Sequence, residues 1–146
     1  MKTNLKRASD WAQRLEIFLR ENHARKFQYG RWDCCLFVAD AIAAMTGSDV
    51  AAEFRGKYAR WGEALRVMEA KTGQRSVAAI AAAVAEEFGM PEAAPGRAQR
   101  GDMALRRRPR GYSLGLVAMN GLEILFPCAM GMGTCPLSDA TRVWHV

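Results

Sequence analysis

The N-terminal part of the chain, up to residue 89, carries apolar side chains at helical spacing. From Ser9 to Asn22 they recur every three or four positions, which predicts an amphipathic helix with Ser9 or Asp10 as its N-cap. The same spacing over Glu63 to Lys71 and over Ser76 to Phe88 predicts two further amphipathic helices.

A helix from Asp33 to Thr46 is predicted to form the buried centre of the domain. Asp33 is a natural N-cap and Gly47 a natural stop signal. Apolar side chains cover a broad face, and Asp40 is the only charge after the cap, so little of this helix is suited to solvent. The apolar positions are Phe37, Val38, Ala41, Ile42 and Met45.

After a Pro-, Ala- and Gly-rich segment at 90–99, the period of the pattern changes to alternation, which predicts β-strands. The predicted strands are Asp102–Arg107, Ser113–Met119, Leu122–Phe126 and a last one within Thr141–Val146, with Asn120 and Gly121 as a two-residue hairpin turn. Helices that precede an antiparallel sheet indicate an α+β fold. We predict a single domain over residues 1–146, helical over about 8–89 and β over about 101–146.

Length, composition and charge narrow the class of protein. A chain of 146 residues, half of them apolar, can bury a core without disulfides. The longest apolar run, Val77 to Ala85, is far too short to span a bilayer, and the basic N-terminus lacks the apolar core of a secretory signal, so we expect synthesis in a cytoplasm. The net charge of +6 favours acidic partners. The densest basic cluster, at 106–110, has only Tyr112 beside it for base stacking, which favours an acidic protein partner or solvent over nucleic acid.

Three sequence motifs, in this order, together resemble the NlpC/P60 cysteine peptidase superfamily: WDCCLFVADAI at 32–42, QRGDMAL at 99–105 and SLGLVAMNG at 113–121. The resemblance covers roughly Phe27 to Phe126 and implies a papain-like α+β fold. It places Cys34 at the nucleophile, Gly101 and Asp102 at the opening of the first strand, and Ser113 where the family carries its catalytic histidine. Compact versions that begin with an amphipathic helix and carry Cys-Cys are similar to tail-assembly proteins of tailed phages and gene transfer agents.

Cysteine chemistry at this site needs a base as well as a nucleophile. The N-terminus of a helix lowers the pKa of a cysteine, which suits Cys34. The histidines are His23 and His145. We expect His23 to be exposed near a helix C-terminus, whereas His145 is the candidate base of an active enzyme or simply a residue of the last strand. Asp102 is a candidate orienting carboxylate, or it closes the turn after Gly101.

The other cysteines allow two interpretations. Cys35 lies about 100° around the helix from Cys34, so we predict that only one of them faces a cleft and that Cys35 packs in the core. Cys128 and Cys135 are predicted on a glycine-rich loop that can fold over the start of the central helix. Cys34, Cys35, Cys128 and Cys135 could then bind zinc or an iron–sulfur cluster, but the spacing lacks the usual close pairs, and we expect neither an obligatory metal nor another cofactor.

The functional hypothesis that follows is a structural or assembly component of a phage-like tail tip, or baseplate, that binds other tail-tip proteins. It would be assembled in the host cytoplasm and reside in the virion. The basic tip at 106–110 and the segment at 129–134 are predicted to be exposed and to contact those partners. The first alternative is an active peptidase or amidase that cleaves peptidoglycan stem peptides with Cys34, His145 and Asp102, and the second is a thiolate-bound metal scaffold.

Overall fold

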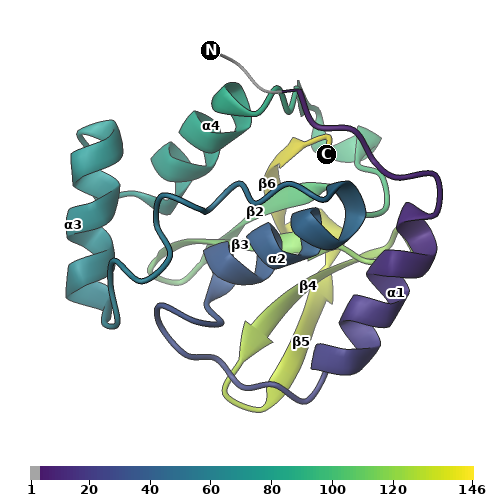
Figure 1. Ribbon diagram of the computed structural model, residues 1–146, viewed down its shortest axis with the longest axis horizontal. Helices are drawn as coiled ribbons and strands as arrows, with labels where there is room; N and C mark the ends of the chain where they lie inside the picture. The colour runs from purple at the N-terminus through teal and green to yellow at the C-terminus, as the bar shows by residue number, and fades with distance from the viewer. Residues whose placement is uncertain (1–3) are drawn as a thin grey trace.

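The computed structural model describes residues 4–146, and the first three residues of the basic N-terminal segment lie outside the described residues. Four helices come first in the chain: α1 (Trp11–Asn22), α2 (Cys34–Thr46), α3 (Trp61–Thr72) and α4 (Val77–Glu87) (Figure 1). Each coincides with a helix predicted from the apolar spacing. Within residues 4–146, none of the helices combines the length and the hydropathy needed to cross a bilayer.

The caps of these helices follow the sequence prediction with one exception. Asp33 accepts a hydrogen bond from the amide of Leu36 (2.9 Å), and Gly47 ends α2 in the left-handed conformation with φ 80°. Asp10 stands at the N-cap position of α1, but its side chain makes no capping hydrogen bond. Its carboxylate instead accepts a hydrogen bond from Arg14 Nε at 2.7 Å, so an ion pair has replaced the expected cap.

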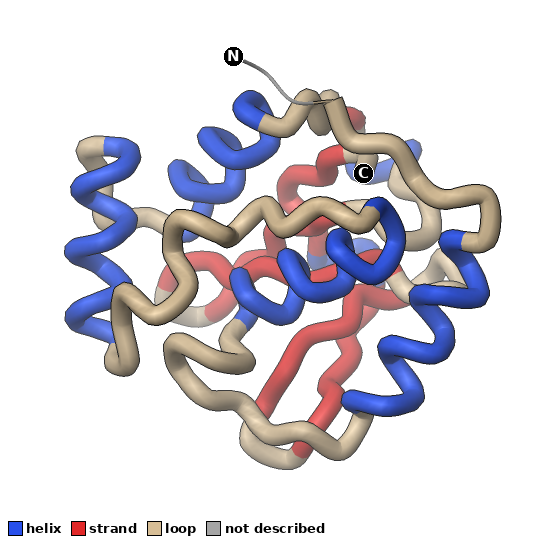
Figure 2. Tube along the Cα trace, viewed as in Figure 1, coloured by secondary structure: helices blue, strands red, loops and turns tan. Residues whose placement is uncertain are grey.

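A six-stranded antiparallel sheet follows, in the order β1-β6-β2-β3-β4-β5 (Figure 2). The strands are β1 (Glu92–Ala93), β2 (Met103–Arg108), β3 (Gly111–Val117), β4 (Glu123–Cys128), β5 (Gly131–Pro136) and β6 (Ala140–Trp144), with short 3-10 turns η1 (Pro95–Arg97) and η2 (Leu137–Asp139). The last strand inserts between β1 and β2. The predicted α+β fold is therefore confirmed.

Two predicted connections were wrong. Asn120 and Gly121 do not form a two-residue turn, because the longer loop 118–122 joins β3 to β4. Asn120 closes this loop by accepting a hydrogen bond from the amide of Leu122 (2.8 Å) and donating one to Glu123 (2.7 Å). The glycine-rich segment expected to be a loop is strand β5. A Cβ added to Gly133 would lie 2.5 Å from the Phe126 ring, so this glycine allows the β4–β5 hairpin to pack.

Helix α2 lies across one face of the sheet, with α1 on one side of it and α4 and then α3 on the other (Figure 1). Its side chains Phe37, Ile42 and Met45 are completely buried, which confirms that it is the centre of the domain. The opposite face of the sheet carries a small second cluster of Ala104, Val117, Ile124 and Val143. Because α2 spans the sheet, its two ends reach two separate groups of polar side chains.

Candidate functional site

Asp33 fixes the N-terminal end of α2 through three hydrogen bonds. Besides capping Leu36, its carboxylate accepts hydrogen bonds from the amide of Gly30 (3.0 Å) and from the hydroxyl of Tyr58 (2.6 Å). Gly30 has φ 80°, and a Cβ there would lie 2.1 Å from the carbonyl oxygen of Tyr58, so only glycine fits this turn. Burial and the neighbouring Asp33 charge raise the pKa of Tyr58, which keeps its hydroxyl protonated as a donor. The first turn of α2 is thus held rigidly.

Two adjacent thiols occupy that first turn. Cys34 Sγ and Cys35 Sγ lie 3.9 Å apart. The pKa of Cys34 is lowered to about 7, chiefly by the hydrogen bond with Cys35 and to a smaller extent by the backbone of Leu114 and the hydroxyl of Ser113, against the opposing effects of burial and of the Asp33 charge. The pKa of Cys35 is raised well above its ordinary value by the same hydrogen bond and by burial. Cys34 is therefore substantially ionised near neutral pH, with Cys35 as its hydrogen-bond donor.

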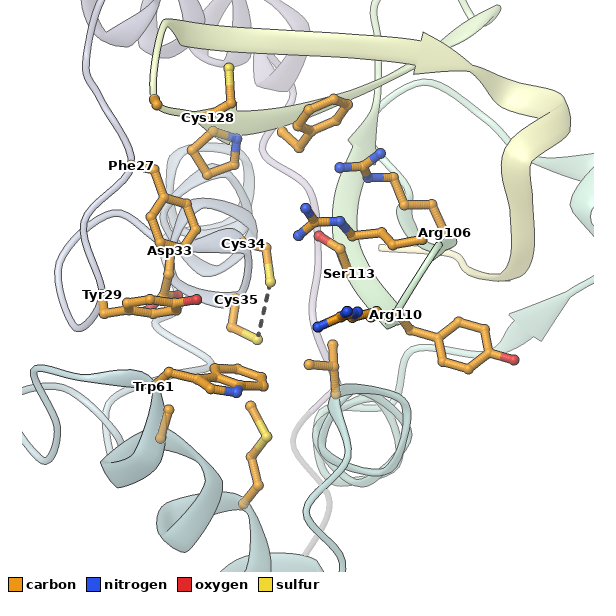
Figure 3. A pocket seen from close by; sticks show the side chains of 18 of the residues that line it. Phe27, Tyr29, Asp33, Cys34, Cys35, Trp61, Arg106, Arg110, Ser113 and Cys128 are labelled. Carbon is orange, nitrogen blue, oxygen red and sulfur yellow. Dashed lines mark hydrogen bonds between the residues drawn. The ribbon is translucent and has the colours of Figure 1, made fainter.

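The two thiols face a cavity of about 750 Å³. Figure 3 shows Phe27, Tyr29 and Trp61 on one side of the cysteines and arginine side chains, among them Arg106 and Arg110, on the other. The aromatic rings contact one another, with centroids 4.7 Å apart for Phe27 and Tyr29 and 5.8 Å apart for Tyr29 and Trp61. The basic wall comes from the β2–β3 hairpin, whose lining residues are Arg106, Arg108, Pro109, Arg110 and Tyr112.

Ser113 lies beside Cys34 in this cavity and is almost fully buried. It occupies the position at which the NlpC/P60 resemblance implies a catalytic histidine. No imidazole lines the cavity within the described residues. His23 is exposed at the end of α1, as predicted, where its Nδ1 lies 2.8 Å from the carbonyl oxygen of Arg20.

His145 lies against Asp102 at the other end of α2. Its Nδ1 is 2.6 Å from Asp102 Oδ2, while Arg7 Nη2 (3.2 Å) and the amide of Val146 (3.3 Å) contact Oδ1. This cluster adjoins Met45, because a Cβ on Gly101 would lie 2.8 Å from the Met45 sulfur. Eleven residues of helix separate Met45 from Cys34, a rise of about 16 Å.

The hypothetical catalytic set of Cys34, His145 and Asp102 is therefore not assembled. The structure brings His145 to Asp102 but brings neither residue to Cys34. Asp102 also closes its own turn by accepting a hydrogen bond from the amide of Gln99 at 2.8 Å, which is the second of the two roles expected for it. The three contacts of Asp102 with Arg7, His145 and Val146 anchor the two ends of the described chain next to the start of β2.

The four cysteines are not arranged as the sequence predicted. Cys34 and Cys35 both line the cavity, so the prediction that only one of them faces a cleft was wrong, whereas Cys35 does pack against the core as predicted. Cys128 also lines the cavity, whereas Cys135 packs with the cluster on the far face of the sheet. The four thiols are therefore not brought together in the way that the four-thiolate alternative requires. In residues 4–146 no cluster of three or more His, Cys, Asp or Glu residues is arranged to hold a metal ion.

Sequence reasoning missed several residues of the site. Tyr58 lies in a segment without helical or strand periodicity. Phe27 and Tyr29 are aromatic residues before the predicted helix, and no role was predicted for them. Trp61 is 45% exposed on the cavity wall, whereas Trp32 is buried in the core. The one available signal was Gly30, which follows Tyr29 and stands three residues before Asp33, because a glycine there is typical of a turn that precedes a capped helix.

The comparison with protein families gives one match over nearly the whole chain. The family model described as a domain of unknown function, DUF6950, matches residues 6–146 and so includes both the α2 cavity and the Asp102 cluster. No curated protein matches the chain. The chain therefore belongs to the DUF6950 family.

Proposed function

We propose that this protein is a non-hydrolytic, protein-binding component of a phage-like tail tip, built on an NlpC/P60-like fold. The observation that carries the proposal is the cavity at the start of α2, where an ionisable Cys34 is accompanied by Ser113 and not by an imidazole. The cavity is open and large enough for a polypeptide segment, while the chemistry for cleaving one is incomplete.

The argument against hydrolysis is about proton transfer. A cysteine hydrolase needs a group that donates a proton to the leaving amine, and imidazole does this near neutral pH. A serine hydroxyl does not ionise in that range, and a guanidinium group does not act as a proton donor in proteins. General acid–base catalysis contributes roughly 10² to 10⁴ in rate, so a thiolate alone is a poor hydrolase.

The tail-tip setting rests on the sequence resemblance, and the surface of the protein is compatible with it. The exposed residues Arg107, Arg108 and Arg110 project from the β2–β3 turn, and the exposed Ala129 and Met130 stand at the β4–β5 turn. Both hairpin turns contribute residues to the rim of the same cavity, namely Arg108 and Arg110 from the first and Ala129 from the second. A partner that enters the cavity would therefore also contact both turns.

A genetic complementation experiment tests this function. The gene is deleted in the cell that encodes it, and induced particles are counted and imaged by electron microscopy. We expect particles with incomplete tails, restored by the wild type and equally by Cys34→Ala, because binding does not need the thiol nucleophile. Complete particles after deletion would contradict an assembly role, and restoration by the wild type but not by Cys34→Ala or Cys34→Ser would favour the hydrolase.

A further inference from the structure

The cavity at the start of α2 has an unbalanced charge. Its lining includes Arg106, Arg108 and Arg110, and the only carboxylate in the described lining is Asp33. The Asp33 carboxylate accepts its hydrogen bonds from Gly30, Leu36 and Tyr58, all within the fold. Within residues 4–146 the ion pairs involve other arginines, and none of these three takes part. The arginine wall is left without a counter-charge.

Arg106 shows this most directly. Its guanidinium lies over the Phe126 ring, 3.6 Å from the centroid, and its Nε is buried without a hydrogen-bond partner among the described residues. A buried donor that lacks a partner costs free energy unless a ligand supplies an acceptor. Stacking on the Phe126 ring holds the planar guanidinium in one orientation, with the Cys135 thiol beside it and without an ion pair among the described residues.

The opposite wall has a different chemistry. Tyr29 and Trp61 are 38% and 45% exposed, although both are large aromatic side chains in contact with each other. Exposed neighbouring rings at the mouth of a cavity are suited to an apolar or aromatic side chain of a ligand. The cavity therefore offers an anion-binding wall and an apolar wall to one occupant.

From these observations we infer that the cavity binds a short segment of a partner polypeptide that carries at least one carboxylate against Arg108 and Arg110 and an apolar side chain against Tyr29 and Trp61. The inference rests on the proposed function and names the chemistry of the partner. A volume of about 750 Å³ lies within the range of ligand cavities and accommodates a few residues.

Charge on the cavity floor favours a peptide over a nucleic acid. Cys34 is ionised in part near neutral pH, and Asp33 lies next to it. A nucleic acid brings one charge with every nucleotide, so several phosphates would be forced close to this thiolate. A peptide can place a single carboxylate at the arginine wall and keep neutral backbone over the cysteines.

Two synthetic pools of C-amidated pentapeptides provide the probe. Each has Phe, Tyr or Trp at its centre and Gly, Ala or Ser elsewhere, with Glu in the acidic pool and Gln in the neutral one. Retention by the full chain is measured by ultrafiltration and mass spectrometry. We expect the acidic pool to bind, and Arg108→Ala/Arg110→Ala to weaken its binding about tenfold or more, since charge-assisted hydrogen bonds contribute about 1.5 to 3 kcal/mol each.

The matched control removes the same charge elsewhere. Arg66 and Arg97 are exposed, do not line the cavity and lie outside both hairpin turns, so Arg66→Ala/Arg97→Ala lowers the net charge equally and should leave binding unchanged. Equal loss in both double variants would overturn the inference, as would displacement of the acidic pool by oligothymidylate or by inorganic phosphate at the same concentration.

The remaining outcomes separate this inference from the proposed function. Retention of the neutral pool to the same extent as the acidic pool would overturn the charge argument and leave peptide binding intact. If neither pool is retained, the inference fails whatever the complementation experiment shows, because particle assembly is scored independently of these peptides. Cleavage of either pool would contradict the non-hydrolytic function itself.

Discussion

The polar side chains at the two ends of α2 differ in how completely they are paired within the fold. At the C-terminal end, the fully buried carboxylate of Asp102 is surrounded by His145, Arg7 and backbone amides, and its contacts are made within the fold. At the N-terminal end, a thiol with a lowered pKa and an arginine wall face an open cavity. The first arrangement stabilises the protein, whereas the second leaves side chains available to bind a ligand or a partner.

This difference separates two residues that look alike in the sequence. Asp102 and Cys34 each open a secondary-structure element, and each stands in a motif that resembles a peptidase. Burial distinguishes them, because a buried polar group that is fully paired has no capacity left for a substrate. At the start of α2, by contrast, Arg106, Arg108 and Arg110 line the cavity without an ion pair among the described residues.

The largest effect is expected at the closed end. Asp102→Ala should lower the free energy of unfolding by about 3 to 5 kcal/mol, because it leaves Arg7, His145 and two partly buried amides without their acceptor. Asp10→Ala is the matched control, since it breaks only the exposed pair with Arg14 and should cost less than about 1 kcal/mol. Urea denaturation measures both. Similar losses in the two variants would contradict the structural role of the buried carboxylate.

The second prediction concerns the thiol pair. Cys35→Ala should raise the pKa of Cys34 from about 7 toward the value of about 8.5 for a free cysteine, because the hydrogen bond from Cys35 is the largest cause of the lowered pKa. The pH dependence of iodoacetamide alkylation, localised by peptide fragmentation, measures the midpoint. An unchanged midpoint would show that the helix N-terminus, and not Cys35, controls the thiol.

The same pKa has a consequence for stability. The native pKa of Cys34 lies below its unfolded value, so the ionised thiol contributes stability above an unfolded pKa of about 8.5. This contribution disappears as the pH falls through about 7. The difference in unfolding free energy between the wild type and Cys34→Ala should therefore shift in favour of the wild type between pH 6 and pH 9, in the range set by these pKa values.

A smaller effect is expected from His145→Gln. It should lower the unfolding free energy by about 1 to 2 kcal/mol, since one hydrogen bond to a buried carboxylate is lost. The alkylation midpoint of Cys34 should not move, because the two residues lie at opposite ends of α2. A shift in that midpoint would show that His145 communicates with the cavity after all.

The smallest effect is expected from Ser113→Ala. The hydroxyl is the last of the causes that lower the pKa of Cys34, so its removal should raise the alkylation midpoint by less than Cys35→Ala does. The reverse order of the two effects would mean that Ser113 has a larger share in holding the thiolate than the geometry indicates.

The sequence predicted the helices well because capping residues and apolar spacing are local signals. Asp33, Gly47 and Ser76 each cap or end a helix where the pattern placed the boundary. Strand β5 was missed because its glycines are explained only by contacts distant in the sequence, Gly133 with the Phe126 ring and Gly131 with the backbone of His23. The position of His145 could not be predicted either, since it depends on β6 inserting between β1 and β2, a long-range pairing without a local signal.

The site was predictable only in part for the same reason. Cys34 and Ser113 were identified from short motifs, and the structure places them side by side. The aromatic wall and Tyr58 come from segments 27–29 and 58–61, which lie far apart in the chain and meet only in the folded structure. The arginines at 106–110 were predicted to be an exposed basic cluster. Which of them line the cavity and which point away from it depends on the β2–β3 hairpin that they occupy.

Incubation of the purified protein with peptidoglycan sacculi tests the central claim most directly. Soluble stem-peptide fragments are quantified by mass spectrometry for the wild type, Cys34→Ala and His145→Ala. The account predicts that the wild type releases no more fragments than Cys34→Ala does, although its Cys34 reacts with iodoacetamide. Release by the wild type that is abolished in Cys34→Ala would contradict the claim, and its loss in His145→Ala as well would identify His145 as the base.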